Sequence, residues 1–367
     1  MREKIPSVRI WPKSPKQRQP VPIAKILSFP IVSAPHVDIM QTDLTSPRKN
    51  PKNPKIGIDL LGGENSPEPL FDALVAWEKL KQEECSFLIL ATEEMCRSYT
   101  KKVGANSSFT FFPVKEAILL EENPLFAIRK KKGSSIAVGM RLLKEKKIDS
   151  LVSFGNTGAL VASASIEIPM RKIHRPALLA FLPTKKNLLA LIDTGANIVA
   201  RAHELKEFAL MGVALQKFQN IDRPKVGLLN IGSEAKKGTK EIQLAFGEIQ
   251  KTAKEKKFLF EGNIEAKDIF EGNVDVLVTN GFTGNVLLKT AEGFSSFVLD
   301  FLKKTPLFRE MQKLLSYAEY GGAFLLGVEG CVIKCHSYSS PQAFLSAVAM
   351  AVGWSSKDFP TFLRKFL

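Results

Sequence analysis

The chain is poor in the residues on which several large protein classes depend. Its 367 residues include four cysteines and four histidines, and no apolar run reaches the ~18 residues that a membrane-spanning helix needs. Four cysteines are too few for a disulfide-held scaffold of this length, and they fit a reducing compartment. Apolar residues make up 45% and charged residues 24% of the chain. These shares are typical of a globular protein and exclude wholesale disorder and collagen-like structure.

Positive charge is in excess and is concentrated at the front of the chain. Lysine and arginine give a net charge of +15, and residues 1–54 supply about half of it. The same segment holds ten of the 21 prolines, and proline disfavours both helix and sheet. We therefore expect residues 1–54 to be a disordered basic extension and residues 55–367 to form the folded, functional domain, in one or two lobes. Translation starting at Met40 would remove most of the extension.

The location of the protein and the nature of its partners follow from the same segment. Its most apolar part, residues 23–34, is interrupted by Lys25 and Pro30, so it does not predict a secretion signal. We expect a cytoplasmic protein. The positive charge favours phosphates, an acidic protein, an anionic membrane surface or nucleic acid as partners.

Strand-like and helix-like patterns alternate from Lys55 onwards. Helical periodicity is seen after Ser66 and Pro67 and again between Phe282 and Phe301. This alternation predicts an α/β fold of three layers, with a mostly parallel sheet covered by helices on both faces. The predicted strands are Ile56–Leu61, Phe87–Ala91, Ser150–Phe154, Leu188–Ile192, Val226–Ile231 and Val274–Thr279.

Turns rich in glycine, asparagine and acidic residues follow five of these strands. Strand-to-helix turns use such residues in any case, but five of them with nearby lysines favour an anion site. Because the carboxyl ends of parallel strands meet at one edge of a sheet, we expect the five turns to converge there. The turns are residues 62–65, 155–159, 193–197, 230–238 and 280–285.

Several standard catalytic motifs are missing. There is neither a G-x-G-x-x-G nor a G-x-S-x-G motif, so neither a nicotinamide site nor a serine nucleophile has local support. Cys331, Cys335 and His336 offer at most three zinc ligands, and we expect them to pack. An enzyme without its own nucleophile can still transfer acyl groups when orthophosphate, already an anion, attacks the carbonyl.

In their order and spacing these motifs resemble the bacterial phosphate acyltransferase family (PlsX type). The resemblance covers essentially residues 55–367 and leaves out the extension. It rests on Ile58–Gly63, Arg129–Ser135, Val152–Ala159, Leu228–Glu234, Asn280–Thr290 and Gly321–Val328, with His336 beyond them.

The resemblance implies an activity and a set of partners. The protein would move a fatty acyl group from acyl carrier protein to orthophosphate, which attacks the thioester directly, and the acyl phosphate would feed phospholipid synthesis. The family is homodimeric and loosely membrane-associated, and it supplies a downstream acyl-phosphate:glycerol-3-phosphate acyltransferase. Its fold is related to those of phosphotransacetylases and isopropylmalate dehydrogenases. No metal, nucleotide cofactor or nucleic acid is expected.

The resemblance also assigns site residues. Asn230 would be an amide donor, Lys237 would stabilise charge, and Lys289 would be the third catalytic residue. Asp193 could instead cap a helix, and residues 129–132 could be a solvated helix face. The residues expected to contact substrate are Gly62, Gly63, Gly155, Asn156, Thr157, Gly158, Asp193, Asn197, Gly232, Glu234, Asn285 and His336.

Four positions depart from the family pattern. Glu64 and Asn280 each replace an aspartate, and the change at Asn280 removes a charge. Gly133 also stands where aspartate is common, and Ser337 stands where the family favours glycine. We interpret these differences as drift beside the motifs.

The residues leave other functions possible. The nearest is a short-chain phosphotransacylase that uses acyl-CoA, followed by a relative of nicotinamide dehydrogenases and by a nucleic-acid-binding module. Residues 297–318, apolar with interspersed basic residues and broken near Pro306, would suit either a membrane interface or a dimer contact.

Overall fold

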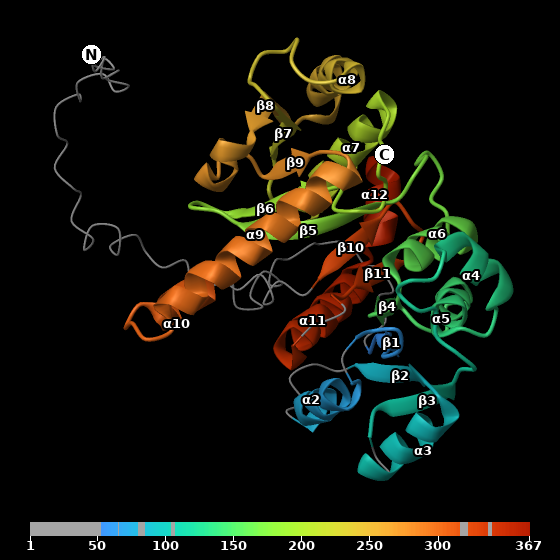
Figure 1. Cartoon of the computed structure of the whole chain (residues 1–367). Helices are drawn as coiled ribbons and strands as arrows, with labels where there is room; N and C mark the ends of the chain where they lie inside the picture. Colours follow the sequence, from blue (N-terminus) through green and yellow to red (C-terminus); the bar gives the residue numbers. More distant parts are fainter. Residues whose placement is uncertain (1–52, 65, 80–84, 104–106, 316–321, 337–339) are drawn as a thin grey trace, which may run out of the picture. The chain divides into compact units, whose positions relative to one another are not determined.

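The computed structural model describes residues 53–64, 66–79, 85–103, 107–315, 322–336 and 340–367 (Figure 1). All of them fall in the unit Met40–Leu367. Apart from its last two residues, the predicted extension of residues 1–54 lies outside the described residues, and so do Met40 and Ser337.

Eleven strands of the described chain form one sheet. They are β1 (Lys55–Asp59), β2 (Ser86–Ala91), β3 (Phe109–Pro113), β4 (Ser150–Ser153), β5 (Ala177–Pro183), β6 (Leu188–Ile192), β7 (Lys225–Asn230), β8 (Leu259–Glu265), β9 (Val276–Val278), β10 (Ala323–Leu326) and β11 (Cys331–Lys334). Their order across the sheet is β3-β2-β1-β4-β11-β10-β5-β6-β9-β7-β8. The six predicted strands are all present. The other five strands include β10 and β11, which enter the middle of the sheet from the far end of the sequence.

The sheet consists of two parallel blocks that run in opposite directions. Strands β3, β2, β1, β4 and β11 are parallel to one another, as are β6, β9, β7 and β8. Strands β10 and β5 lie between the blocks, and the three pairings they make are antiparallel. The prediction of a mostly parallel sheet is confirmed. The expectation that all five turns share one edge is wrong, because three antiparallel steps reverse the second block relative to the first.

Helices cover both faces of this sheet. They are α2 (Glu68–Lys79), α3 (Glu93–Lys102), α4 (Pro124–Lys130), α5 (Ser135–Lys144), α6 (Thr157–Glu167), α7 (Ala202–Phe218), α8 (Lys240–Lys256), α9 (Gly281–Leu302), α10 (Phe308–Leu315), α11 (Pro341–Lys357) and α12 (Phe359–Phe366), with the 3₁₀ helix η2 (Ala266–Glu271). Residues of α2, α3, α7, α11 and α12 share the largest apolar core on one face. On the opposite face α4, α5 and α6 cover the first block, and α9 with η2 covers the second. Leu178 of β5 packs in the cluster under α4, α5 and α6, and Leu182 of β5 packs in the cluster under α9 and η2. The two leucines are four residues apart, so they lie on the same face of the strand.

Helix α9 crosses in front of β5 and β6 (Figure 1). It was predicted from its apolar periodicity, and it begins where the Asn280 side chain accepts a hydrogen bond from the Thr283 N–H at 2.9 Å. Leu287 and Leu288 pack toward the sheet. A stripe of large apolar side chains on the same helix is exposed instead: Phe282, Val286, Phe294, Phe297 and Phe301. The chain breaks between α9 and α10 around Pro306, as expected.

Candidate functional site

The sequence-predicted site residues fall into two groups, one at the end of each parallel block. The first turn group follows β1, β4 and β11, and it contains Gly62, Gly63, Gly155, Asn156, Thr157, Gly158 and His336. The second turn group follows β6, β7 and β9, and it contains Asp193, Asn197, Asn230, Gly232, Glu234, Lys237 and Asn285. Lys289 lies further along α9.

The turns after β1 and β4 touch each other. Gly62 has φ +78°, and a Cβ on it would lie 3.0 Å from the Gly155 Cα and 3.2 Å from the Ile118 carbonyl oxygen. Any larger residue at Gly62 would be strained and would also push the two turns apart. Glycine at this position is therefore required by the close approach of two backbones.

A row of polar side chains lies beneath the first turn group. Asp59, Ser153 and Lys334 end β1, β4 and β11, and the strand registers pair Ser153 with each of the other two. The Ser153 hydroxyl donates to Asp59 Oδ2 at 2.7 Å, and the Gly155 N–H donates to Ser153 Oγ at 3.1 Å. Asp59 is fully buried and Lys334 is only 8% exposed. Sequence reasoning missed both charged residues.

Burial shifts the pKa of both charged residues in this row, Asp59 and Lys334. It raises the pKa of Asp59 to about 6, although hydrogen bonds from Ser153, Ser135 and the Leu61 N–H act in the opposite direction. It lowers the pKa of Lys334 to about 8. The Lys334 ammonium donates to the Phe154 carbonyl at 3.3 Å and also contacts the Cys335 carbonyl. The only signal for these residues in the sequence is a charge at the end of a short apolar strand.

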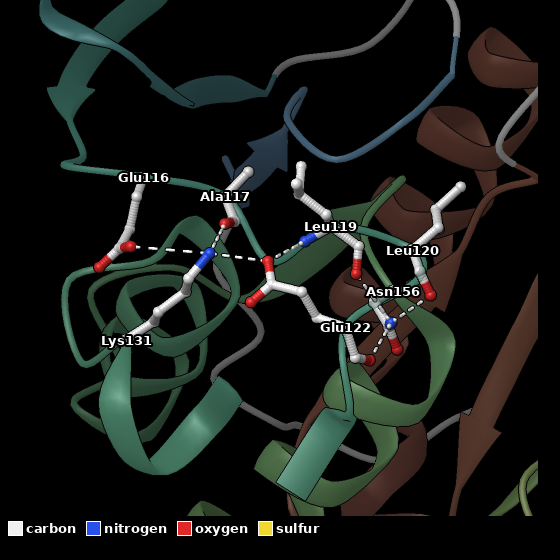
Figure 2. A network of polar contacts seen from close by, with 7 residues as sticks. All are labelled: Glu116, Ala117, Leu119, Leu120, Glu122, Lys131 and Asn156. Carbon is white, nitrogen blue, oxygen red and sulfur yellow. Dashed lines mark hydrogen bonds and ion pairs between the residues drawn. The ribbon is translucent and has the colours of Figure 1, made fainter. Parts of the chain in front are cut away.

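Asn156 shapes the turn in which it lies (Figure 2). Its amide nitrogen donates to the carbonyls of Leu119 and Leu120, each at 3.0 Å, and to that of Glu122 at 3.4 Å. Its oxygen accepts from the Ala159 N–H at 3.0 Å and so caps α6. Both ends of this amide are thus used by the protein, so the structure gives Asn156 a positioning role.

Lys131 fixes the segment of residues 117–122, whose carbonyls Asn156 contacts (Figure 2). Its ammonium donates to Glu122 Oε1 at 2.7 Å and to the Ala117 carbonyl at 3.0 Å, and it lies 3.7 Å from Glu116. Glu122 in turn accepts from the Leu119 N–H at 2.8 Å. Among the basic residues 129–132, Lys131 is therefore structural, whereas the other three are exposed.

Asp193 organises the turn after β6. Its Oδ1 accepts from the N–H groups of Leu178, Gly195 and Ala196, and its Oδ2 accepts from the backbone and side-chain amides of Asn197. Burial raises its pKa in spite of these donors. Asp193 does not cap a helix, and its carboxylate is used within the turn.

The turn after β6 also supports the start of α9. The Gly281 N–H donates to the Asn197 carbonyl at 2.7 Å, and a Cβ on Gly195 would lie 3.7 Å from the Asn285 side chain. The capping oxygen of Asn280 does what an aspartate oxygen would do, so this departure from the family pattern leaves the helix start intact.

Asn230, the last residue of β7, stabilises the loop that follows the strand. The Asn230 amide donates to the Lys237 carbonyl at 3.1 Å, and its oxygen accepts from the Ile231 N–H at 2.8 Å. The side chains of Lys237, Glu234 and Ile231 are exposed. Asn230 thus folds the loop that presents Lys237 to its surroundings.

Helix α9 joins the two turn groups. The charge of Lys289 acts on both His336 and Lys334 of the first turn group, and Lys289 pairs with Glu292 at 2.7 Å. Burial, with the charge of Lys289, lowers the pKa of His336, so its imidazole is neutral near pH 7. The helix therefore runs from the second turn group into the electrostatic reach of the first.

The cysteines and the described surface offer no metal chemistry of the usual kind. Burial raises the pKa of the Cys331 and Cys335 thiols to about 12, so both stay protonated. In the described ranges, no three histidine, cysteine or acidic side chains are placed to share a metal ion. No helix in the same ranges is long and apolar enough to cross a membrane.

Comparisons with known proteins match the chain over most of its length. A family model described as fatty acid synthesis protein matches residues 54–361. The phosphate acyltransferase of Chlamydia abortus is 38% identical over 308 residues, which cover 82% of this chain and 95% of that protein. The phosphate acyltransferase of Dictyoglomus turgidum is 37% identical, with 81% and 93% covered.

Solved structures share the fold at low sequence identity. The EutD phosphotransacetylase of Staphylococcus aureus superposes with a TM-score of 0.59 at 16% identity, over 87% of this chain and 98% of that one. A phosphotransacetylase of Streptococcus pyogenes gives a TM-score of 0.57 at 18% identity, over 84% and 95%. These likenesses confirm the expected phosphotransacetylase architecture.

Proposed function

Since the chain belongs to the fatty acid synthesis protein family, in which curated relatives are named phosphate acyltransferases, we propose that it transfers a fatty acyl group from acyl carrier protein to orthophosphate. Family membership supports acyl transfer involving phosphate. The carrier-protein donor, the length of the acyl chain and the route of the reaction are our proposals. These proposals are supported by the family-model match, which covers residues 54–361 and so includes both turn groups.

In the proposed reaction orthophosphate is the nucleophile. One of its oxygens attacks the thioester carbonyl, the carbon–sulfur bond breaks, and the carrier leaves as a thiolate that takes up a proton. The protein must hold the phosphate near the carbonyl and stabilise the oxyanion. Lys289, whose charge reaches the first turn group, would supply positive charge, with the turn at Gly155–Gly158 as neutral donors.

Exposed apolar side chains beside both turn groups support a long acyl chain. Near the first group they lie in the segment that Asn156 and Lys131 anchor, and near the second group they follow β6, follow β7 and begin α9. Water-exposed side chains of this size are costly unless an apolar ligand or partner covers them. They are Leu119, Leu120, Leu125, Phe126, Ile198, Val199, Ile231, Phe282 and Val286.

Trapping of the product tests the proposal. The protein is incubated with an acyl carrier protein thioester and orthophosphate, and hydroxylamine converts acyl phosphate into a hydroxamate. We expect hydroxamate only when phosphate is present, and more of it from a long-chain carrier thioester than from acetyl-CoA. No phosphate-dependent hydroxamate would overturn the proposal, and a preference for short acyl-CoA would favour a short-chain phosphotransacylase.

The other two readings are tested by binding. A nicotinamide dehydrogenase relative would be stabilised by NAD or NADP in a thermal melt, and we expect no such shift. A nucleic-acid-binding module would retain tight DNA binding at physiological salt when residues 1–54 are removed, and we expect weak, salt-sensitive binding.

The assembly and location of the protein are part of the same proposal. We infer a cytoplasmic homodimer that contacts anionic membrane at its periphery and passes acyl phosphate to the downstream acyltransferase. The exposed stripe on α9 supports a contact surface, and Lys303, Lys304 and Arg309 near it are exposed cations.

A further inference from the structure

We propose that Lys334 is an anion-positioning residue, whose buried ammonium contacts the turn after β4 and provides a fixed positive charge for the phosphate that binds there. This inference rests on the function proposed above and deepens it. It names a group for phosphate that neither the sequence motifs nor the family resemblance indicated.

The Lys334 ammonium lies against the turn that follows β4. Lys334 donates to the carbonyl of Phe154, the residue directly before Gly155, and its neighbour in register is Ser153. Ser153 accepts from the Gly155 N–H. Two members of the row therefore touch the turn itself, and in Figure 1 β4 lies between β1 and β11.

This buried cation has no ion pair with a carboxylate of the described residues. Within the described ranges no carboxylate lies within 4.0 Å of the Lys334 ammonium. Asp59 acts on it from further away and is itself bonded to Ser153. A buried ammonium is costly without an anion in contact. The two backbone carbonyls that it contacts are neutral, so in the part of the chain that the structure describes this charge has no ion pair in contact with it.

The turn after β4 also offers hydrogen-bond donors for an anion. Among the described residues the backbone N–H groups of Asn156, Thr157 and Gly158 have no hydrogen-bond acceptor. Consecutive N–H groups at the start of a helix suit a phosphate oxygen. Lys334 adds the charge that distinguishes a phosphate site from an ordinary helix start.

The other charged groups around Lys334 are consistent with this role. Lys289 acts on it from α9, and His336 and the thiol of Cys335 follow it in the chain. Because His336 is neutral and the Cys335 thiol is protonated, the positive charge described at this end of the block comes from Lys334 and Lys289, while the carboxylates of Glu64 and Glu292 also act on His336. Glu292 pairs with Lys289, whereas no carboxylate of the described residues contacts Lys334, so Lys334 adds an unpaired positive charge for a bound phosphate to that of Lys289.

The test compares three variants with the unmodified chain: Lys334→Met, Lys334→Arg and, as a matched control, Lys101→Met, since Lys101 is an exposed residue of α3. Binding of inorganic phosphate is measured by titration calorimetry, the KM for phosphate and kcat are measured in acyl transfer, and the unfolding midpoint is measured in urea. We expect Lys334→Met to raise both the Kd and the KM for phosphate about tenfold or more. Its unfolding midpoint should stay level or rise, because the unpaired buried charge is gone. Lys334→Arg should recover part of the affinity, and Lys101→Met should change nothing.

Two results would overturn the inference. One is an unchanged Kd and KM for phosphate in Lys334→Met. The other is a loss of phosphate binding that comes with a lower unfolding midpoint and is not recovered by arginine, since that pattern indicates a structural lysine. The binding measurement decides the inference even if the unmodified protein makes no acyl phosphate, a result that would count against the proposed function alone.

Discussion

At the scale of single residues, Asp59 links protonation to folding. It has no exposed surface, and burial raises its pKa from 3.8 to about 6. Between about pH 4 and 6 the folded protein keeps a proton that the unfolded chain has released. The stability that Asp59 contributes therefore falls as the pH rises through this window, and it is constant above it.

The variant Asp59→Asn tests this titration. Urea unfolding of the unmodified chain and of the variant is compared from pH 4 to 7.5, so that all other titrating groups cancel. The free energy of unfolding of the unmodified chain, relative to the variant, should fall by about 2 kcal/mol between pH 4 and 6 and then level off. A difference that stays constant with pH would contradict the buried, proton-binding state of Asp59.

Asn156 should raise the free energy of unfolding through its hydrogen bonds to the segment of residues 117–122. Asn156→Ala removes three donated hydrogen bonds and the cap of α6, and we expect a loss of about 2 kcal/mol or more in the free energy of unfolding. Asn123→Ala is the matched control, since Asn123 caps α4 with a single bond to the Phe126 N–H, and about 1 kcal/mol is expected there. Equal losses in the two variants would show that the bonds to the segment contribute nothing.

The sequence located these polar residues better than it predicted their roles. Asn156, Asp193 and Asn230 were predicted as substrate contacts or an amide donor, and their side chains are occupied within their own turns. Asparagine and aspartate satisfy unpaired backbone groups wherever a strand ends, and the pattern of residues is the same for both uses. Lys334 and Asp59 escaped notice because their burial depends on β1, β4 and β11 being neighbours, which no local pattern reveals.

At the scale of elements, α9 connects the two parallel blocks. It starts against the turn after β6 and carries Lys289 toward His336 and Lys334. The start of the helix is tightly packed, since a Cβ on Gly284 would lie 1.9 Å from the Asp193 carbonyl oxygen. Further along, a Cβ on Gly293 would meet nothing within 4 Å.

These two glycines of one helix give opposite predictions. Gly284→Ala should lower the free energy of unfolding by several kcal/mol, about 3 or more, because backbone must move to admit the methyl group. Gly293→Ala should raise it by about 0.5–1 kcal/mol through helix propensity. Both are measured by urea unfolding at one pH. A Gly284→Ala variant as stable as the unmodified chain would contradict the close contact between α9 and the turn after β6.

The sequence predicted individual strands and helices, but it did not predict the order of the strands in the sheet. The predicted strands and the helix at Phe282–Phe301 follow from short apolar runs and from helical periodicity. Strands β10 and β11 come from the last part of the chain and insert beside β4 and β5. Their antiparallel pairings reverse the second block, so five turns that look alike in sequence lie in two groups.

At the scale of the whole molecule, the stripe on α9 predicts a contact between copies of the chain. Three of its phenylalanines also lie close to one another, with centroids of Phe297 and Phe301 4.9 Å apart and of Phe294 and Phe297 6.4 Å apart. Exposed apolar side chains gathered along one helix in this way mark an interaction site.

Replacing Phe297 and Phe301 by serine tests this contact. We expect sedimentation equilibrium to show a dimer for the unmodified chain and a monomer for the double variant, with Leu244→Ser on α8, another exposed apolar residue, as control. If the mass does not change but binding to anionic vesicles is lost, the stripe is a membrane contact and the dimer prediction for it is wrong.

The central claim is that this chain moves an acyl group onto orthophosphate. The most direct test supplies phosphate labelled with ¹⁸O at all its oxygens, together with a long-chain acyl carrier protein thioester, and analyses the product by mass spectrometry. Attack by phosphate on the carbonyl predicts acyl phosphate that retains every labelled oxygen. Unlabelled free fatty acid as the only product, formed at the same rate without phosphate, would contradict the account.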